Sequence, residues 1–512
     1  MKFHRLVPAS FVVAAVALNG CGSEPSSDAD VQSVSAAVTI QKSYPRKLYV
    51  HMMPWFQVGG QHWSMNSRNA ATGVASWYNP MIGEYSSNDG NVIEYQLLMM
   101  KYAGIDGVII DWPGLNGGYD RPQNKANSDA IIAKTAQFGL EFAVCYEDQY
   151  ADSLDAAKAD MVYVRDQLMS KANHIKVNGA PMVMVFGPQK FKSAGEWSSI
   201  LSVFSSKPSF FPLWYNDSAG ASASGKFAWV AQNGLKGLND FDNGLDGVDH
   251  GNKVPVLYPG FNPYYANGGW PGPTWKVSYT LKSDNTEGGD TLASTFELGK
   301  FAGEPLQIAT WNDYGEGTMI EPTNQFQYKF LQTLQQSVGA VYTDAELKIV
   351  KMLFDGRKAN KPQMDEASAD LAKLDVAAAC KILGCTAPVH MGAGGGSGTS
   401  GAPGTAGATG VAGARTGTGG TGSAGAPTGS SGAPTTNAGS SNASAGAAGK
   451  PTGSAGSTAA GGASNGAPQP VEGGGKCSVT TPGAGGTGSS ALLVAAGALV
   501  FAAGRRRRRL GA

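Results

Sequence analysis

The stretch Leu306-Gln-Ile-Ala-Thr-Trp-Asn-Asp-Tyr-Gly-Glu-Gly317 passes from a short apolar run into a polar turn. Its first six residues combine aliphatic, β-branched and aromatic side chains, which predicts a buried strand. Turn-forming residues begin at Asn312, so the strand is expected to end there. The turn carries two carboxylates three residues apart, Asp313 and Glu316. The stretch therefore predicts a strand that delivers a pair of acids at its carboxyl end.

Seven further apolar runs precede this strand. Together the eight predicted strands cover residues 47–54, 107–111, 141–146, 181–186, 210–215, 227–230, 254–258 and 306–311. Helical periodicity lies between several of them, at residues 92–103, 128–138, 156–172 and 195–205. Continuous apolar strands that alternate with helices are typical of a parallel sheet covered on both faces. The pattern predicts an α/β fold, a (β/α)8 TIM barrel.

An open, doubly wound sheet is the alternative arrangement of such elements. That fold commonly places a glycine-rich dinucleotide-binding turn after its first strand. Here Pro54-Trp55-Phe56 follows the first predicted strand instead, which favours the barrel.

Composition divides the 512-residue chain into a folded part and flanking segments. A short linker, residues 22–44, precedes one predicted domain, residues 45–385, which has the aromatic and aliphatic content to bury a core. Residues 386–475 are almost wholly Gly, Ala, Ser, Thr and Pro. Such a composition cannot offset the entropy cost of ordering, so a disordered, low-complexity tether is expected.

The two ends of the chain predict export and attachment to a surface. Residues 1–21 read as an export signal, and Leu18-Asn-Gly-Cys21 resembles a bacterial lipobox, which would make Cys21 the lipidated first residue; an ordinary signal peptide is the alternative. Within residues 476–512 an apolar run precedes five arginines, an order that resembles the C-terminal sorting signals of myxobacterial surface proteins. A retained membrane anchor is the competing interpretation. The expected location is the outer membrane, the cell surface or the extracellular space.

Cysteine use and charge exclude several classes of function. Cys380 and Cys385 are separated by four residues in an oxidising compartment and are expected to form a disulfide, whereas Cys145 lies in an apolar strand as a buried thiol. The six histidines show no metal-ligand spacing, so no metal and no cofactor are expected. Net charge is zero without a basic stripe, which argues against nucleic acid as a partner. The chain is expected to act as a monomer.

Polar and aromatic residues recur at the predicted strand ends, where a barrel of this kind places its active site. They are His51, Trp55, Asp111, Trp112, Tyr146, Glu147, Trp214, Tyr215 and Tyr258, with Trp311, Tyr314 and Glu321 from the last strand and its turn. Aromatic rings can stack on the C–H faces of sugars, and acids bind sugar hydroxyls. Together with Asp313 and Glu316 as a catalytic pair, the set predicts a site that cleaves glycosidic bonds of a polysaccharide. The alternative for the two acids is a solvated loop that caps the following helix.

Several of these segments resemble known glycoside hydrolases. Trp311-Asn-Asp-Tyr-Gly-Glu316 resembles the signature of family 71, the fungal α-1,3-glucanases, and Glu316-Gly-Thr-Met-Ile-Glu-Pro322 is similar to the corresponding segment of family 99, the endo-α-mannosidases and endo-α-mannanases. Tyr49-Val-His-Met-Met-Pro-Trp55, Ala103-Gly-Ile-Asp-Gly-Val-Ile-Ile-Asp-Trp112 and Tyr258-Pro-Gly-Phe261 are similar to other strands of those families. The resemblance covers roughly residues 45–340.

The resemblance implies an endo-acting α-glycosidase with Glu316 as general acid and Asp313 as its partner. In family 99 the residue that matches Asp313 is usually Glu and acts as a base on the substrate's 2-hydroxyl with net retention, whereas family 71 enzymes are thought to invert by activating water. Asp is one methylene shorter than Glu, so the stereochemical course stays open. The implied substrates are α-1,3-glucan and α-mannan. The alternatives are a catalytically inactive surface glycan-binding protein with the same barrel, and a structural surface protein without a sugar site.

Overall fold

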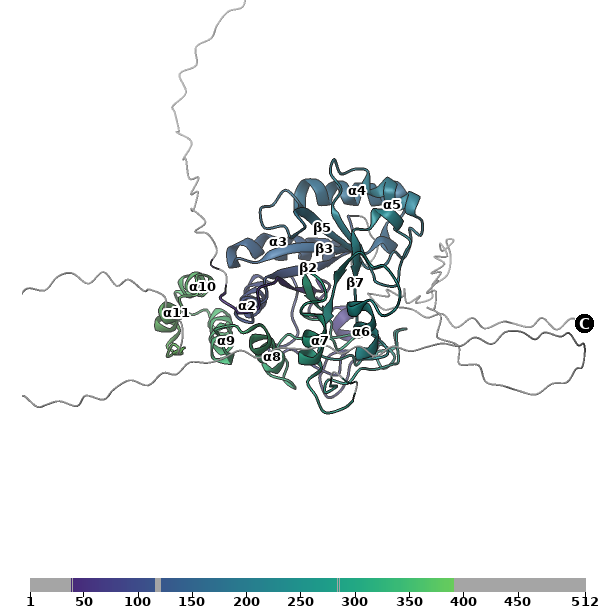
Figure 1. Ribbon diagram of the computed structural model, residues 1–512. Coiled ribbons are helices and arrows are strands. Elements are labelled where there is room, and N and C mark those ends of the chain that lie inside the picture. Colours follow the sequence, from purple (N-terminus) through teal and green to yellow (C-terminus); the bar gives the residue numbers. More distant parts are fainter. Residues whose placement is uncertain (1–37, 39, 116–120, 283, 285, 391–512) are drawn as a thin grey trace, which may run out of the picture. The chain divides into compact units, whose positions relative to one another are not determined.

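The computed structural model describes residues 38, 40–115, 121–282, 284 and 286–390 (Figure 1). The predicted export signal, the lipidation at Cys21, the tether beyond residue 390 and the sorting or anchor segment lie outside these residues. No helix within the described ranges has both the length and the apolar character that crossing a membrane requires.

Parallel strands form a closed ring. The chain contributes, in order, β1 (Leu48–Met52), β2 (Gly107–Trp112), β3 (Glu141–Tyr146), β5 (Ala180–Val185), β6 (Ser209–Pro212), β7 (Gly225–Phe227), β8 (Asn252–Val254), β9 (Val256–Leu257) and β10 (Leu306–Ile308). β1 pairs with both β2 and β10, and the pairing continues from β2 to β3, β5 and β6 on one side and from β10 to β9 on the other. The short β4 (Lys176–Val177) runs antiparallel to β5 outside the ring.

Two connections close the ring on the side opposite β1. Leu213, directly after β6, forms a parallel bridge with Phe227 of β7, and β7 pairs in parallel with β8. β8 and β9 together form one strand of the barrel. They are separated only by Pro255, which has no N–H to donate to a neighbouring strand. The strand pairing thus has eight positions and confirms the predicted (β/α)8 barrel over an open sheet.

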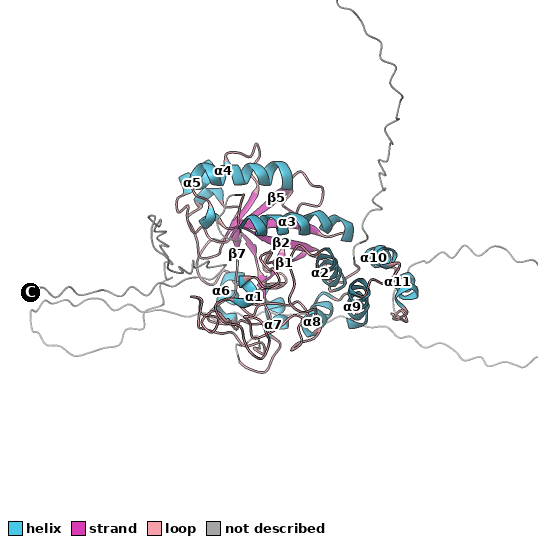
Figure 2. Ribbon diagram, turned by 180° about the vertical axis from the view of Figure 1, so that it is seen from behind, coloured by secondary structure: helices cyan, strands magenta, loops and turns pink. Residues whose placement is uncertain are grey.

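Helices follow most strands and cover the outside of the barrel. They are α2 (Gly90–Tyr102), α3 (Arg121–Thr135), α4 (Leu154–Tyr163), α5 (Ala194–Leu201), α6 (Leu235–Asn243), α7 (Thr291–Gly299) and α8 (Lys329–Val338), and the short α1 (Gln61–Ser64) belongs to the connection from β1 to α2. Figures 1 and 2 show α3, α4 and α5 outside β2, β3 and β5. Between β6 and β7 a single 3-10 turn, Gly220–Ser222, replaces a helix. Strands β1, β2, β3, β5, β6, β9 and β10 are largely buried on both faces, which explains their mostly apolar sequence, whereas β7 and β8 each carry a lysine.

Three further helices extend the domain beyond the barrel. α9 (Asp344–Lys358), α10 (Met364–Ala372) and α11 (Val376–Leu383) form a group in which α9 packs on α2. Glu94 of α2 accepts two hydrogen bonds from Arg357 of α9, both at 2.9 Å, and a third from Ser368 of α10. Lys101 of α2 donates to the carbonyl of Ala372 at 2.6 Å. These buried polar contacts fix the group against the barrel.

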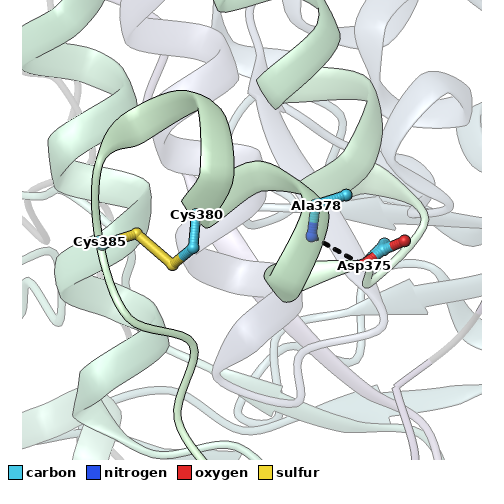
Figure 3. The surroundings of a disulfide bond; sticks show 4 residues. All are labelled: Asp375, Ala378, Cys380 and Cys385. Atoms are coloured by element: carbon cyan, nitrogen blue, oxygen red, sulfur yellow. Dashed lines mark hydrogen bonds between the residues drawn. A yellow bond between two sulfur atoms is a disulfide. The ribbon is translucent and has the colours of Figure 1, made fainter.

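A disulfide joins α11 to the residues that follow it. Cys380 of α11 and Cys385 are joined, and the carboxylate of Asp375 accepts from the N–H of Ala378 at 2.9 Å, so it caps the start of the helix (Figure 3). Cys145 in β3 is a free, buried thiol.

Candidate active site

Four buried carboxyl groups from three strand ends lie at the carboxyl end of the barrel. Asp111 belongs to the end of β2, Glu147 directly follows β3, and Asp313 and Glu316 lie on the turn after β10. The most exposed of the four, Asp111, is only 9% exposed. Their charges influence one another: burial and then the charge of Asp313 raise the pKa of Asp111, and Glu316 adds to this effect. The barrel thus joins residues that are up to 205 positions apart in sequence.

The turn that carries Asp313 and Glu316 is held from both sides. The Met53 N–H donates to Asn312 Oδ1 at 2.8 Å, and Asn312 Nδ2 donates to the Met53 carbonyl at 3.0 Å, so the Asn side chain pairs with the end of β1 as a strand would. On the other side the Asn262 N–H donates to the Glu316 carbonyl at 2.9 Å, and the Tyr264 N–H to the Gly315 carbonyl at 2.8 Å. The acids are therefore neither solvated nor at the start of a helix, and α8 begins only at Lys329.

Two glycines allow this close packing. A Cβ on Gly315 would lie 3.1 Å from the ring of Tyr265. Gly317 has φ +69°, and its Cβ would lie 2.8 Å from the Asn262 carbonyl. Glycine is thus needed on both sides of Glu316 for steric reasons, because a side chain at either position would meet a packed neighbour.

Asp313 and Glu316 have different proton affinities. Burial raises the pKa of Asp313 to about 7, but the backbone N–H groups of Glu316, at 2.9 Å, and of Gly315 oppose this by favouring the ionised form. Burial and then the charge of Asp313 raise the pKa of Glu316 well above its ordinary value, partly offset by a hydrogen bond from the side chain of Trp229. Within the described chain Glu316 Oε2 has no hydrogen-bond partner. Asp313 is therefore the first of the two to ionise, and Glu316 keeps its proton.

Asp111 and Glu147 form a second acidic pair. Their carboxyl groups share a hydrogen bond, and burial followed by the charge of Asp111 raises the pKa of Glu147 well above its ordinary value. Gln149 Nε2 donates to Glu147 Oε2 at 2.7 Å. Two carboxyl groups so close cannot both ionise readily, so the pair retains a proton that Glu147 holds more tightly.

Two side chains of this site were missed in the sequence. Trp229, just after β7, faces Glu316 and packs edge-on against His51 at a ring distance of 4.8 Å. Tyr265, in the connection from β9 to α7, packs against Gly315; burial and then the charges of Asp313 and Glu316 raise its pKa. Trp229 could have been found, because it is another aromatic residue at a strand end. No local pattern distinguishes Tyr265.

Three predicted sugar-binding residues lie in the layer between strands and helices instead. Trp112 stacks on Tyr163 of α4 at 5.8 Å, and Tyr146 Oη donates to Asp160 Oδ2 of the same helix at 2.6 Å. The cause is strand alternation: if Asp111 points to the barrel axis, Trp112 must point away, and the same holds for Tyr146 before Glu147. Tyr258 is fully buried, and its hydroxyl donates to the carbonyl of Gly234 beside α6 at 3.4 Å.

His51 lies inside the barrel, where it contacts other protein groups. Its Nε2 is 2.6 Å from Gln307 Oε1, whose amide nitrogen donates to the Ala228 carbonyl at 2.8 Å. Burial lowers the pKa of His51 to about 4, so the imidazole is neutral and contributes to the barrel interior.

Glu321 has a structural role beneath the turn. Gln96 donates to its Oε1 at 2.8 Å, and the hydroxyls of Tyr85 and Tyr314 donate to its Oε2 at 3.0 and 2.9 Å. Burial raises the pKa of Glu321 to about 7, opposed by these donors and by Trp311. Tyr314 and Trp311 are themselves fully buried. Glu321, Tyr314 and Trp311 are therefore buried residues that hold the turn in place.

Of the remaining predicted residues, Tyr215 interacts with the acids, whereas Trp214 and Trp55 pack on other rings. Tyr215 is 47% exposed, and its burial and then the charges of Glu147 and Glu316 raise its pKa. Trp214 is half-buried and packs on Phe241 of α6. Trp55 stacks on His62 at 4.8 Å.

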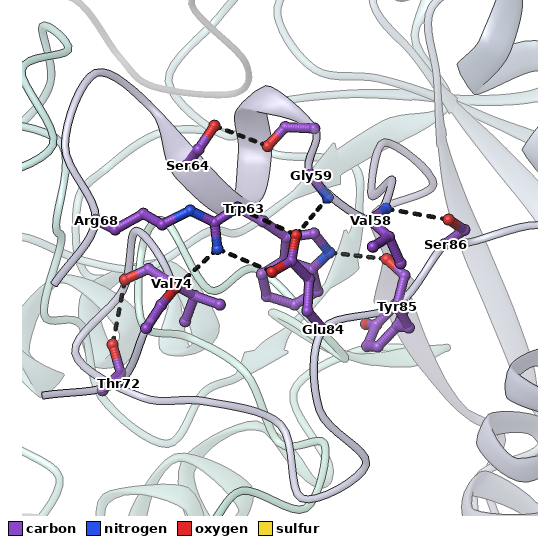
Figure 4. Close-up of polar contacts among 12 residues, drawn as sticks. Val58, Gly59, Trp63, Ser64, Arg68, Thr72, Val74, Glu84, Tyr85 and Ser86 are labelled. Atoms are coloured by element: carbon purple, nitrogen blue, oxygen red, sulfur yellow. Dashed lines mark hydrogen bonds and ion pairs between the residues drawn. The ribbon is translucent and has the colours of Figure 1, made fainter. Parts of the chain in front are cut away.

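The connection from β1 to α2 is rigidly organised around Glu84 (Figure 4). Arg68 donates to both carboxylate oxygens of Glu84 at 2.8 and 3.2 Å, and the Gly59 N–H donates to the same group. Trp63 Nε1 donates to the Tyr85 carbonyl at 2.8 Å. The segment that carries Trp55 is thus a fixed wall of the barrel's carboxyl end. Among the described residues no group of three or more His, Cys, Asp or Glu side chains is arranged to hold a metal ion.

Comparisons with known proteins were made at the level of sequence and of structure. No protein-family model matches the chain, and no curated protein sequence matches it. Among solved structures the chain is similar to the GH99 endo-alpha-mannosidase from Bacteroides thetaiotaomicron, with 16% identity and a TM-score of 0.44 over 59% of this chain and 98% of that one. It is also similar to a glycoside hydrolase-like protein, with 12% identity and a TM-score of 0.41 over 59% and 96% of the two chains. A GH113 beta-1,4-mannanase matches with 7% identity and a TM-score of 0.31, over 57% and 99%. The assignment of the barrel rests on the strand pairing described above.

Proposed function

We propose that the protein is a glycoside hydrolase in which Glu316 is the general acid and Asp313 the base. The observation that carries this proposal is the separation of proton affinities within one buried turn. Asp313 is stabilised as an anion by the backbone N–H of Glu316, and its charge in turn keeps the proton on Glu316. Two carboxyl groups with opposite protonation states are what glycosidic cleavage requires.

The two acids divide the reaction between them. Glu316 donates its proton to the leaving glycosidic oxygen, through the Oε2 that has no partner among the described residues. Asp313 removes a proton from the attacking hydroxyl, which belongs either to water or to the neighbouring sugar carbon. If the attacking hydroxyl is that of water, its oxygen bonds to the sugar carbon as the glycosidic bond breaks, and the two acids regain their starting protonation states by exchange with solvent. If it is the neighbouring sugar hydroxyl, a 1,2-anhydro sugar forms; Glu316, now ionised, takes a proton from the water that opens this ring, and Asp313 returns its proton to the sugar oxygen.

The second acidic pair supplies contacts to the substrate. Protonated Glu147 can donate a hydrogen bond to a sugar hydroxyl oxygen, and ionised Asp111 can accept one from a sugar hydroxyl. Tyr215, which is 47% exposed, adds aromatic surface near Glu147 and Glu316. Resemblance of the turn to families 71 and 99 supports an α-linked polymer, α-1,3-glucan or α-mannan, cleaved internally. The patterns at the two chain ends support export and attachment to the cell surface, with the protein acting as a monomer.

Product release tests this proposal. The full-length chain is incubated with yeast α-mannan and with α-1,3-glucan, and released oligosaccharides are measured beside the Glu316→Gln variant. We expect release from one polymer, reduced about 10²–10⁴-fold or more in the variant, while binding persists. Binding without release by the unmodified protein would instead support a surface glycan-binding protein. Near-normal turnover by the variant would refute the assignment of Glu316.

A further inference from the structure

Trp275 lies in the long connection between β9 and α7 with one ring face covered by Phe261. The two rings are stacked, with centroids 4.1 Å apart and planes 18° from parallel. Phe261 is buried, whereas Trp275 is half-buried and its neighbours Thr274 and Lys276 are exposed. A half-buried indole that is covered on one face by another ring leaves its other side as the part that can face solvent.

The stacking follows from a short antiparallel pairing of the backbone. The Phe261 N–H donates to the Val277 carbonyl and the Val277 N–H donates back to Phe261, both at 2.9 Å. Trp275 is two residues from Val277 and is therefore the diagonal neighbour of Phe261 on the same face of the pair. The ring orientation is thus set by backbone pairing as well as by side-chain packing.

The same pairing is attached to the catalytic turn at two points. Asn262, next to Phe261, donates its N–H to the Glu316 carbonyl at 2.9 Å. Tyr279, two residues beyond Val277, donates its hydroxyl to the Gly317 carbonyl. Trp275 is therefore held by a scaffold whose two strands both bind the backbone of the residues that deliver the acid.

We propose that Trp275 is a stacking platform for a pyranose ring of the polysaccharide, outside the two sugars that flank the cleaved bond. The proposal rests on the proposed glycosidase function and adds a further subsite to it. The C–H face of a pyranose can pack on an indole ring, and a platform rigidly joined to Glu316 orients the chain at low entropic cost.

Chain-length dependence of binding tests this subsite. Affinities of full-length Glu316→Gln for α-manno- and α-1,3-gluco-oligosaccharides are measured by calorimetry with and without Trp275→Ala. We expect about 3- to 10-fold weaker binding of long oligosaccharides and unchanged binding of the disaccharide, the size of one lost aromatic contact. Trp275→Tyr should restore most of the affinity. Phe301→Ala is the matched control, because Phe301 is 65% exposed and precedes β10 at the opposite end of the barrel.

The outcomes separate this inference from the function on which it rests. If the unmodified protein cleaves a polymer but Trp275→Ala binds its long oligosaccharides normally, the platform is refuted and the glycosidase assignment stands. Equal losses for the disaccharide and the long oligosaccharides would show general damage to the site and would also refute the platform. If the unmodified protein neither cleaves nor binds either glycan, the proposed function itself fails.

Discussion

The backbone N–H of Glu316 donates to Oδ1 of Asp313 over 2.9 Å, so the proposed acid directly stabilises the anionic form of its partner. Asp313 affects Glu316 in turn, because burial and then the charge of Asp313 raise the pKa of Glu316. A spacing of three residues brings the N–H of the second acid to the carboxylate of the first, much as an Asx turn does. Within the buried turn, the backbone N–H thus favours the anion of Asp313, and the charge of Asp313 favours the protonated form of Glu316.

The first prediction concerns the pH dependence of hydrolysis. Activity needs Asp313 ionised and Glu316 protonated, so kcat/KM should rise as pH increases through about 7, where Asp313 loses its proton, and fall again at higher pH as Glu316 ionises. Initial rates across the pH range measure both limbs. A profile with full activity near pH 4 would contradict the assignment of Asp313 as the base.

The second prediction concerns Gly317. Gly317→Ala should lower both stability and activity, because the residue has φ +69° and its new Cβ would lie 2.8 Å from the Asn262 carbonyl. We expect a loss of about 1–3 kcal/mol and a marked fall in kcat as the turn shifts. Urea unfolding and steady-state rates measure the two effects.

A glycine on the barrel exterior provides the control for this change. Gly195 in α5 has nothing within 4 Å of an added Cβ, so Gly195→Ala should be neutral or stabilising by up to about 1 kcal/mol. Equal losses from both substitutions would rule out a specific steric role for Gly317.

The third prediction concerns the attachment of the C-terminal helices. Arg357→Ala leaves Glu94 of α2 with one hydrogen bond from Ser368 in place of three, in a largely buried setting. Removing one partner of a buried ion pair costs about 3–5 kcal/mol, and partial exposure of Arg357 reduces the expected loss to about 2–3 kcal/mol. Lys351→Ala, which removes an exposed pair with Asp355 on the same helix, should cost less than about 1 kcal/mol in denaturant unfolding.

The fourth prediction concerns Asp242 of α6, which is buried with no partner for either carboxylate oxygen among the described residues. Burial raises the pKa of Asp242 to about 7, opposed by Lys253. The folded pKa lies above the unfolded one, so this contribution to stability is fully present below about pH 4 and is lost as pH rises through about 7. Replacing Asp242 by Asn should therefore flatten the decline in unfolding free energy between about pH 4 and about pH 7, an effect on the order of a few kcal/mol.

Thermal and urea unfolding at several pH values check this expectation. Asp152→Asn, at an exposed position, is the matched control and should leave the pH dependence unchanged. An identical pH dependence in Asp242→Asn and the unmodified protein would show that Asp242 is not the group responsible.

The sequence by itself determined the approximate positions of most barrel strands, although β7 overlaps the predicted strand 227–230 only at Phe227 and β10 ends at Ile308, before Trp311; it also located the two acids of the last turn. Most barrel strands are short apolar runs because they are buried on both faces, so they can be recognised locally; β7 and β8, which carry Lys226 and Lys253, are the exceptions. Asp313 and Glu316 could be found for the same reason, because their strand, their turn and their spacing all lie within residues 306–317.

Only the tertiary structure decided which strand-end residues belong to the site. Asp111 and Trp112 are neighbours in sequence, yet the first joins the acids and the second packs on Tyr163, because adjacent side chains of a strand point to opposite faces. Glu321 depends on Gln96, a partner 225 residues away, which no local pattern encodes. Periodicity in a sequence reports which residues are buried, whereas the partners of a buried polar side chain are set by how distant segments pack together.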